Sequence, residues 1–381
     1  MSETAYLFGY PLALSQRATR DANQLFVGSA AANTRRIWGW IDLGREPCVL
    51  SLPDTFGRYL VVCLHDAWHT AFASLGARTT GTGARAFAIL GPSRQGMHLR
   101  AGLDPIAAPT RIVHVTGCLE ASSAEDADLA GAIRVTPLSR WTGPLDGTPL
   151  VPVDTTAEEV SAAVEEVERL DARTFHAQVL ELSEDNPPEP TDRGMLTQVR
   201  ARVEHAPPDA LELSARKALD ALRRASASLA GDATGAWRVG YDLGRYGADY
   251  LGRAAAARVR LGADPATDEL AAVVDADADG VPLTGQERYV LRFPEDAKPP
   301  VSAFWSLSTA AGSISDLEGL VLDGDGSLSI RIQHRPPARD RAANWLTAPA
   351  SAFSLALRLH WPREEALAGR WLPPPVIRVA P

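Results

Sequence analysis

The sequence predicts a mainly β protein with inserted helices (an α+β fold), in which two β-rich lobes flank a helical middle region. Short apolar runs cut by turn residues fill both ends of the chain, as in strands joined by tight turns. Four tryptophans precede residue 142 and four follow residue 304, with Trp237 alone between them. Because large aromatic side chains dominate β cores, these patterns place strands at both ends of the chain.

Residues 1–150 form the predicted N-terminal β domain. Its opening segment, from residue 5 to about 25, has apolar residues at helical spacing. Beyond that segment the apolar runs are short and bounded by turn residues, which is typical of strands. The strand-like runs are 47–53, 58–64, 86–90 and 111–115.

Residues 151–264 form the predicted helical connecting region. Thr155 and Glu158 have the spacing of a capping box, and apolar residues after them recur at helical spacing as far as Leu170. The proline-rich run 186–190 predicts a stop. Two further helices are predicted, one from about residue 206 and one over about 234–260.

Residues 265–381 form the predicted C-terminal β domain. Residues 328–332 and 353–359 alternate apolar and polar side chains, which is the pattern of strands with one buried face. Turn residues at 277–280 and 323–326 lie beside such runs. An antiparallel sandwich or a jelly roll accommodates this order of strands and turns.

Two segments resemble ligand-binding loops, but each lacks a feature that the motif requires. Residues 275–280 repeat the spaced aspartates of an EF-hand, but Gln286 occupies the twelfth position, where that loop needs a bidentate glutamate. Residues 81–86 imitate a dinucleotide-binding fingerprint, yet the run after them predicts a strand where the fingerprint must open a helix. A hairpin turn is predicted at the first segment, and no cofactor is predicted at either.

Composition limits the partners and the location. The formal net charge is −9, and clusters of Lys and Arg interleaved with aromatics are missing, which disfavours nucleic acid. No window reaches the ~18 apolar residues of a membrane-spanning helix, and the N-terminal residues do not resemble a secretion signal. Cys48, Cys63 and Cys118 lie in apolar runs and are predicted to be buried thiols. A cytoplasmic protein with no membrane partner is expected, and a homo-oligomer is left open.

The run His65-Asp66-Ala-Trp68-His69 is the most chemically dense segment. Imidazole and carboxylate side chains in one short segment suit general acid–base catalysis, so His65, Asp66 and His69 are the predicted catalytic residues. Two histidines four residues apart on a helix also share a metal ion in some sites. A strand pattern runs into this segment, however, so a divalent metal at His65 and His69 is only an alternative, and no metal ligand is predicted.

Motifs at both ends of the chain carry a family resemblance. Tyr6-Leu-Phe-Gly-Tyr-Pro11, Trp40-Ile-Asp-Leu43, Gly57-Arg-Tyr59, Asp66 and Leu75-Gly-Ala-Arg-Thr-Thr-Gly81 resemble domain of unknown function 1254. Pro299-Pro-Val-Ser-Ala-Phe-Trp-Ser306, Asn344-Trp-Leu-Thr-Ala-Pro349 and Gly369-Arg-Trp-Leu-Pro-Pro-Pro375 resemble its usual bacterial partner, domain of unknown function 1214. The resemblance implies two jelly-roll-like β lobes with inserted helices. It implies no reaction, because the family's chemistry is unassigned.

Departures from the family pattern, together with an arginine and a tryptophan inside matching motifs, supply the candidate substrate-binding residues. The family commonly has an acid and then a tyrosine after the asparagine at position 33, whereas this chain reads Asn33-Thr-Arg-Arg36-Ile-Trp38. Arginines recognise carboxylates, phosphates and polyhydroxylated groups, and tryptophans stack on planar ligands or sugars. The predicted substrate-binding residues are Asn33, Arg36, Trp38, Trp68, Arg78 and Trp305.

These features predict a small-molecule-acting bacterial protein. The favoured interpretation is an enzyme without a redox cofactor that performs a lyase, isomerase or hydrolase step on an anionic or polyhydroxylated metabolite, in the setting of specialised metabolism. A saccharide- or metabolite-binding protein without turnover is the first alternative. A structural assembly module is the second.

Overall fold

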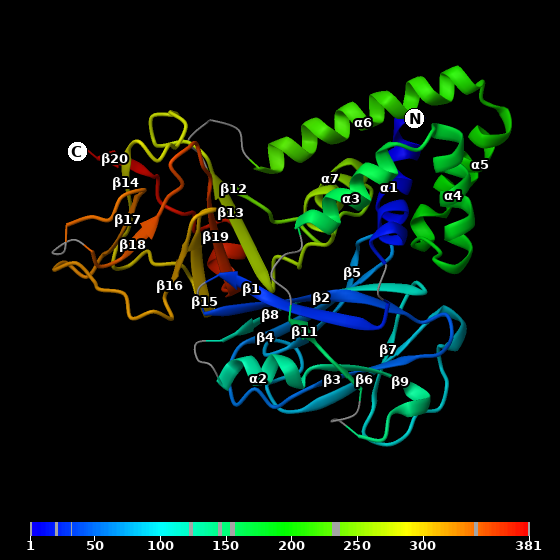
Figure 1. The fold of residues 1–381 in the computed structure, drawn as a ribbon, viewed down its shortest axis with the longest axis horizontal. Coiled ribbons are helices and arrows are strands. Elements are labelled where there is room, and N and C mark those ends of the chain that lie inside the picture. Colours follow the sequence, from blue (N-terminus) through cyan, green and yellow to red (C-terminus); the bar gives the residue numbers. More distant parts are fainter. Residues whose placement is uncertain are drawn as a thin grey trace. The chain divides into compact units, whose positions relative to one another are not determined.

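The computed structural model describes residues 2–19, 22–31, 33–121, 125–143, 147–152, 157–230, 237–338 and 342–379 (Figure 1). Helices and mostly antiparallel sheets together confirm the predicted α+β class. The chain divides into two compact units. The first contains Met1–Gly28, Arg35–Leu229 and Leu243–Asp264, and the second contains Ser29–Thr34, Ala230–Asp242 and Pro265–Pro381.

A β-sandwich forms the base of the first unit. Its six-stranded sheet has the order β11 (Val151–Pro152), β1 (Gln24–Ala31), β2 (Thr34–Asp42), β8 (Ile112–Glu120), β4 (Leu60–Asp66), β5 (Ala71–Gly76). Its five-stranded sheet has the order β10 (Thr148–Pro149), β9 (Arg134–Pro137), β3 (Cys48–Leu52), β6 (Arg85–Leu90), β7 (Asp104–Ala107). Alternate residues of both sheets, among them Val62, Leu64, Val113 and Ile89, pack into one core between them.

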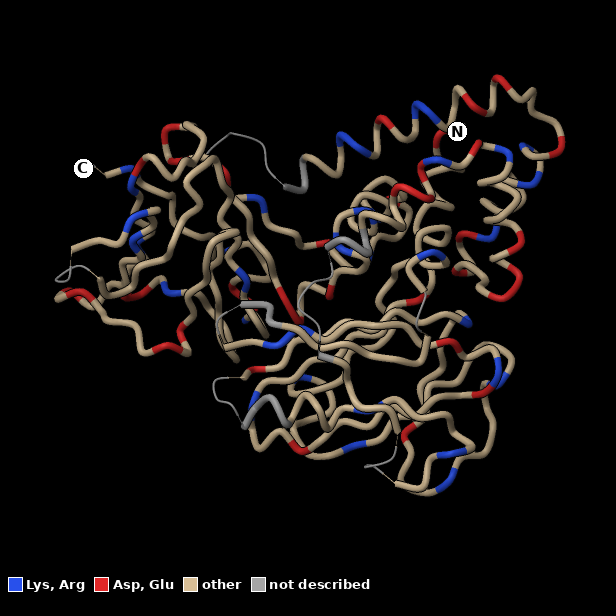
Figure 2. Tube along the Cα trace, in the orientation of Figure 1, with Lys and Arg blue, Asp and Glu red and all other residues tan. Residues whose placement is uncertain are grey.

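Helices cover the other face of the six-stranded sheet (Figure 1). They are α1 (Ser2–Ala18), α3 (Ala157–Glu168), α4 (Ala172–Asp185), α5 (Arg193–His205), α6 (Pro208–Ala230) and α7 (Tyr250–Arg260). Their apolar sides share a core with Trp40 of β2 and Ile112 of β8. Both acidic and basic residues lie along α6 (Figure 2), where the pair Arg216–Glu212 has helical i,i+4 spacing.

The helix α1 is the centre of this helical layer, since it contacts α3, α4, α5 and α7. Gly9 makes the contact with α4 close: a Cβ atom at Gly9 would lie 2.6 Å from Cγ2 of the fully buried Val179. A side chain at position 9 would therefore push the two helices apart.

The second unit is also a β-sandwich. One sheet has the order β12 (Arg238–Val239), β13 (Glu269–Val274), β19 (Leu355–Pro362), β15 (Val301–Ser308), β16 (Ser313–Ser315). The other has the order β18 (Trp345–Thr347), β17 (Leu328–Gln333), β14 (Arg288–Phe293), β20 (Ile377–Val379). The alternation predicted at 328–332 is confirmed, because Leu328, Ile330 and Ile332 are buried in the core while the residues between them are partly exposed.

Short elements complete the description. They are α2 (Glu125–Ala132), α8 (Glu364–Leu367) and the 3-10 helices η1 (Pro92–Arg94), η2 (Leu138–Arg140) and η3 (Pro190–Asp192). The predicted turn at 275–280 is confirmed: Asp277 Oδ1 accepts hydrogen bonds from the amides of Asp279 and Val281, each at 3.0 Å. The predicted stop at 186–190 is confirmed as well, since Asn186 caps the end of α4.

Two predicted helices differ from the structure. The opening helix ends at Ala18 rather than near residue 25, because Leu25 belongs to strand β1 and packs in the sandwich core. The helix predicted over 234–260 begins only at Tyr250, where Asp249 caps it by accepting from the amide of Gly252. Glycines with positive φ at 244 and 247 interrupt the helical pattern before it.

Other sequence predictions have a mixed outcome. The helix α5 was missed, although it lies between two predicted helices. Thr155 of the predicted capping box lies outside the described residues. The helices α3 to α7 belong to the first compact unit, so the separate helical region at 151–264 stays a prediction. Within the described ranges, no helix is both long and apolar enough to span a membrane.

Candidate functional site

A group of histidines lies on the helix-covered face of the six-stranded sheet. His65 of β4 and His114 of β8 are directly opposite each other in the antiparallel register. Since the even-numbered residues of β4 and the odd-numbered residues of β8 fill the sandwich core, the side chains of His65 and His114 point the other way, toward the helices. Their ring centroids are 5.8 Å apart, and both side chains are buried.

A tight turn between β4 and β5 places the ring of His69 beside that of His114. Residues 66–70 reverse the chain between β4 and β5, with hydrogen bonds from Asp66 N to Thr70 O at 2.9 Å and from His69 N to Asp66 O at 3.0 Å. His69 has a φ of 65°, in the left-handed region. The His69 ring lies 6.0 Å from that of His114 and 6.3 Å from that of Trp40.

Asp66 holds this turn together. Its Oδ1 accepts from the amides of Trp68 at 2.9 Å and Thr70 at 2.8 Å. Burial raises the pKa of this carboxyl to about 6, although the two amides and the charge of Arg253 act in the opposite direction. Asp66 therefore stabilises the turn that carries His69, and its catalytic role stays a prediction.

Hydrogen bonds fix the tautomer of His69. Ser15 Oγ donates to the carbonyl of Ala67 at 2.9 Å, so it accepts from His69 Nε2, also at 2.9 Å. The proton of the neutral ring is thus on Nε2, and Nδ1 carries a lone pair with no partner in the described part of the chain. Burial, with smaller contributions from His65 and Arg253, lowers the pKa of His69 to about 3.

A threonine joins His65 to a carboxylate. His65 Nε2 lies 2.9 Å from Thr116 Oγ1, and the Thr116 hydroxyl donates a short hydrogen bond to Asp264 Oδ1. Burial on its own raises the pKa of Asp264, but contact with His65, the Thr116 hydrogen bond and the charge of Arg36 together lower it to about 2. The Asp264 side chain is 15% exposed, so this end of the hydrogen-bond chain reaches the surface of the first unit.

His114 completes the group. Its ring packs on Trp40 with centroids 4.3 Å apart and an interplanar angle of 32°. Gly262, at a φ of 114°, lets the backbone pass beside it, because a Cβ there would lie 2.8 Å from His114 Nδ1. Burial lowers the pKa of His114 well below its ordinary value, and His65, His69 and Arg36 lower it further.

The three imidazoles share one feature. Among the described residues, Nδ1 of His65, His69 and His114 is buried and has no hydrogen-bond partner. No group of three or more His, Cys, Asp or Glu side chains there has the arrangement of a metal site. The arrangement suits proton transfer, since unpartnered imidazole nitrogens next to a carboxylate relay can accept and donate protons.

Trp68 is a core residue. It is 1% exposed, stacks on Phe8 with ring centroids 4.6 Å apart, and donates from Nε1 to the carbonyl of Asn186 at 3.0 Å. These contacts give Trp68 a packing role, and the ligand contact predicted from the sequence stays a prediction.

Arg36 and Trp38 lie on β2, two residues apart and therefore on the same face as Trp40. Arg36 is exposed, and its charge acts on both His114 and Asp264. Trp38 is half-buried and stacks on Phe26 with ring centroids 6.1 Å apart. Of the predicted substrate-binding residues, Arg36 is the one whose charge contributes to the lowered pKa of a histidine, His114.

Arg78 lies away from the histidines. It follows Gly76, which pairs with Val61, whereas His65 pairs with Ala71 at the other end of the β4–β5 hairpin. The four-residue step from Val61 to His65 corresponds to about 13 Å of strand.

Asn33 and Trp305 belong to the second compact unit. Asn33 lies between β1 and β2 with a φ of 59°. Trp305 is 3% exposed, packs on Phe293 at a centroid distance of 5.6 Å, and is part of the sandwich core. Trp305 therefore packs in the core of the second unit, and its ligand contact stays a prediction.

Four residues of the candidate site were not predicted from the sequence: Ser15, His114, Thr116 and Asp264. The sequence pattern could have indicated two of them, since His114 and Thr116 are polar residues two apart in a run that otherwise predicts a buried strand. Nothing local marks Ser15 or Asp264, which reach the group only through the packing of α1 and the chain after α7.

Comparison with solved structures finds a protein with a similar fold. The crystal structure of the VPA0106 protein from Vibrio parahaemolyticus has a TM-score of 0.71 and 21% sequence identity, over 100% of this chain and 99% of that one. An uncharacterised protein from Burkholderia cenocepacia has a TM-score of 0.47 and 10% identity, over 98% of this chain and 88% of that one. At these identities the first likeness is one of fold alone. No curated protein matches the sequence.

Family models match the two ends of the chain. Residues 13–136 match the model described as a protein of unknown function, DUF1254, and residues 268–364 match the one described as a protein of unknown function, DUF1214. The two models cover the N-terminal and C-terminal regions in the order that the sequence motifs predicted. The chain therefore belongs to the two-domain family that combines DUF1254 with DUF1214.

Proposed function

We propose that the protein is an acid–base enzyme without a redox cofactor, acting on an anionic or polyhydroxylated small molecule in a lyase, isomerase or hydrolase step. The observation that carries this proposal is the group of buried imidazoles at His65, His69 and His114, each with an unpartnered Nδ1. Sites that catalyse proton transfer hold such groups in a fixed orientation and away from bulk water.

The two histidines with side-chain hydrogen-bond partners, His65 and His69, have different surroundings. His65 is joined through Thr116 to the carboxylate of Asp264, whereas His69 is joined to the neutral hydroxyl of Ser15. Different surroundings for two titratable groups are the usual basis for dividing acid and base roles. His69 then serves as the proton acceptor through Nδ1, and His65 as the proton donor.

An anionic substrate fits this division. The charge of Arg253 contributes to the low pKa of His69, and a bound anion offsets that charge. Binding of substrate then makes His69 more basic at the moment when a base is required. Exposed Arg36, whose charge reaches His114 and Asp264, favours the same sign of substrate charge.

Hydrogen–deuterium exchange on candidate substrates tests the proposal. Wild-type protein is incubated in D2O with sugars, sugar acids, hydroxy acids and oxo acids, and proton NMR follows loss of C–H signals and formation of products. Catalysed exchange or conversion that His69→Gln abolishes, while Thr148→Val at an exposed strand position leaves it intact, is the expected result. Saturable binding without exchange or conversion identifies a binding protein instead, and the absence of both removes the basis for either function.

A further inference from the structure

Arg253 of α7 is a buried arginine whose hydrogen bonds are incomplete. It is 3% exposed and forms an ion pair with Asp192, at 3.5 Å between Nη1 and Oδ2. Its Nε and Nη2 atoms are buried and, among the residues that the structure describes, have no hydrogen-bond partner. Burying donors without acceptors costs free energy, so proteins rarely retain them without an occupant.

The surroundings of this guanidinium occupy its faces and its Nη1 end but give its other edge no hydrogen-bond acceptor among the described residues. The guanidinium carbon lies 5.1 Å from the ring centroid of Tyr250 and 5.8 Å from that of Phe8, so aromatic rings pack on the group. The Nη1 end is occupied by Asp192, which is itself fixed by a 2.7 Å hydrogen bond from the Tyr250 hydroxyl. The remaining edge, formed by Nε and Nη2, is the unpartnered one.

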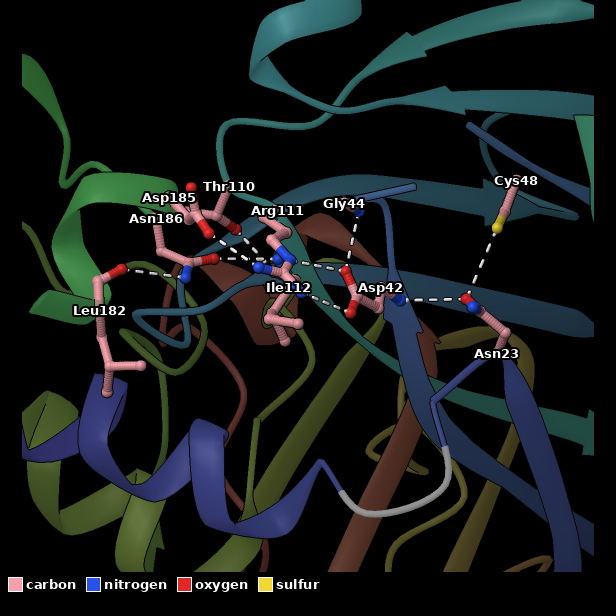
Figure 3. Close-up of polar contacts among 10 residues, drawn as sticks. All are labelled: Asn23, Asp42, Gly44, Cys48, Thr110, Arg111, Ile112, Leu182, Asp185 and Asn186. Atoms are coloured by element: carbon pink, nitrogen blue, oxygen red, sulfur yellow. Dashed lines mark hydrogen bonds and ion pairs between the residues drawn. The ribbon is translucent and has the colours of Figure 1, made fainter. Parts of the chain in front are cut away.

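Arg111 in the same chain shows what this edge binds (Figure 3). Its Nε and Nη2 donate to the two oxygens of Asp42, at 2.8 and 2.9 Å. Two parallel N–H groups match the two oxygens of a carboxylate, and this bidentate geometry is specific to arginine. At Arg253 the equivalent acceptor is not supplied by the described part of the protein.

We propose that the Nε–Nη2 edge of Arg253 binds the carboxylate group of a small-molecule ligand. The inference rests on the proposed function and names its substrate class, since the charge of Arg253 reaches both Asp66 and His69. A monocarboxylate fits better than a phosphate dianion, because Asp192 already offsets the charge of Arg253 and Asp66 is a second acid nearby.

Ligand-observed fluorine NMR tests the assignment with difluoroacetate, 2-fluoropropionate and 4-fluorobenzoate as probes. Their primary amides, which keep shape but lose the negative charge, are the matched ligands, and fluorophosphate is the competing oxyanion. The wild-type protein is expected to bind at least one carboxylate about tenfold more tightly than its amide, as loss of a charged bidentate contact predicts. No preference for carboxylate over amide overturns the inference and leaves water as the occupant. Tighter binding of fluorophosphate overturns the carboxylate assignment.

Variants separate this inference from the proposed function. Arg253→Lys keeps the charge but loses the planar edge and is expected to lose the carboxylate preference, whereas Arg111→Lys, a matched change elsewhere, keeps it. His69→Gln is expected to retain binding and lose turnover. If the wild-type protein binds carboxylates without turnover, only the enzymatic proposal is contradicted. If Arg253→Lys retains turnover and its carboxylate affinity is unchanged, only the role of Arg253 is contradicted. If Arg253→Lys fails to fold, the wild-type comparison of carboxylate with amide decides alone.

Discussion

His65 Nε2 lies 3.6 Å from Asp264 Oδ1, with the Thr116 hydroxyl hydrogen-bonded to both groups. The bridge links strands β4 and β8 to the chain that follows α7. It also joins a fully buried imidazole to a carboxylate with 15% of its side chain exposed. A proton relay between the interior of the first unit and solvent needs such a connection.

Thr116→Val should break this bridge. Valine has the shape of threonine but no hydroxyl, so His65 loses an acceptor and Asp264 loses a donor in a buried setting. We expect the free energy of unfolding to fall by about 1–3 kcal/mol, measured by urea denaturation. Thr148→Val, at an exposed position of β10, is the control and should change stability little. Equal stabilities of the two variants would show that the bridge contributes nothing to folding.

Asp66→Asn should change how stability depends on pH. The ordinary pKa of 3.8 rises to about 6 in the folded state, so the folded protein binds the proton more tightly than the unfolded chain. The stability that this group contributes is present below pH 3.8 and is lost as pH rises through 6. Asparagine stays neutral and still accepts from both amides, so the variant should gain up to about 3 kcal/mol over wild type between pH 4 and 7.

The matched control for that measurement is Asp54→Asn. Asp54 Oδ1 also accepts from the amide two residues ahead, at 2.7 Å from Phe56 N, but its side chain is exposed. Denaturation of both variants across this pH range should show a pH-dependent difference from wild type only for Asp66→Asn. A parallel offset in both variants would contradict the burial argument.

Arg111→Lys should weaken the attachment of α4 to the sandwich (Figure 3). Arg111 binds both oxygens of Asp42 and, through Nη1, Asp185 at the end of α4 at 2.7 Å. These contacts lower the pKa of Asp42 and raise that of Arg111. Because Arg111 is 42% exposed, we expect a loss of only about 1 kcal/mol, smaller at high salt.

Arg85→Lys is the comparison for Arg111→Lys. Arg85 forms one exposed ion pair with Asp104 at 2.8 Å. Its replacement should change the urea midpoint less than Arg111→Lys does, and a similar or larger change would show that bidentate geometry has no special value here.

Gly9→Ala should destabilise the helical layer. The new methyl group would lie 2.6 Å from Val179 Cγ2, and we expect a cost of about 1–3 kcal/mol by thermal or urea denaturation. Val179→Ala in the same chain should recover part of that loss. Gly194→Ala in α5, where a Cβ meets nothing within 4 Å, should instead stabilise by up to about 1 kcal/mol. Equal effects at positions 9 and 194 would contradict the close packing of α1 on α4.

The candidate site was only partly predictable from the sequence. His65 and His69 were identified because two imidazoles and an acid lie within five residues. The turn-forming role of Asp66 was not predicted, because an aspartate that accepts from backbone amides two and four residues ahead looks the same in sequence as a catalytic one. The sequence also did not show that the side chains of Trp68 and Trp305 pack in cores, since a buried tryptophan and an exposed one look the same in a short segment.

Short segments of the chain are enough to predict the α+β class, the two β-rich regions around helices and the family, since alternation, turn residues and motifs are local properties. Which polar groups meet depends instead on how the whole chain packs. The β4–β8 register places His114 opposite His65, and α1 and the return after α7 supply Ser15 and Asp264. Those contacts join residues far apart in the chain, and their existence depends on how strands pair and helices pack, which no short segment encodes.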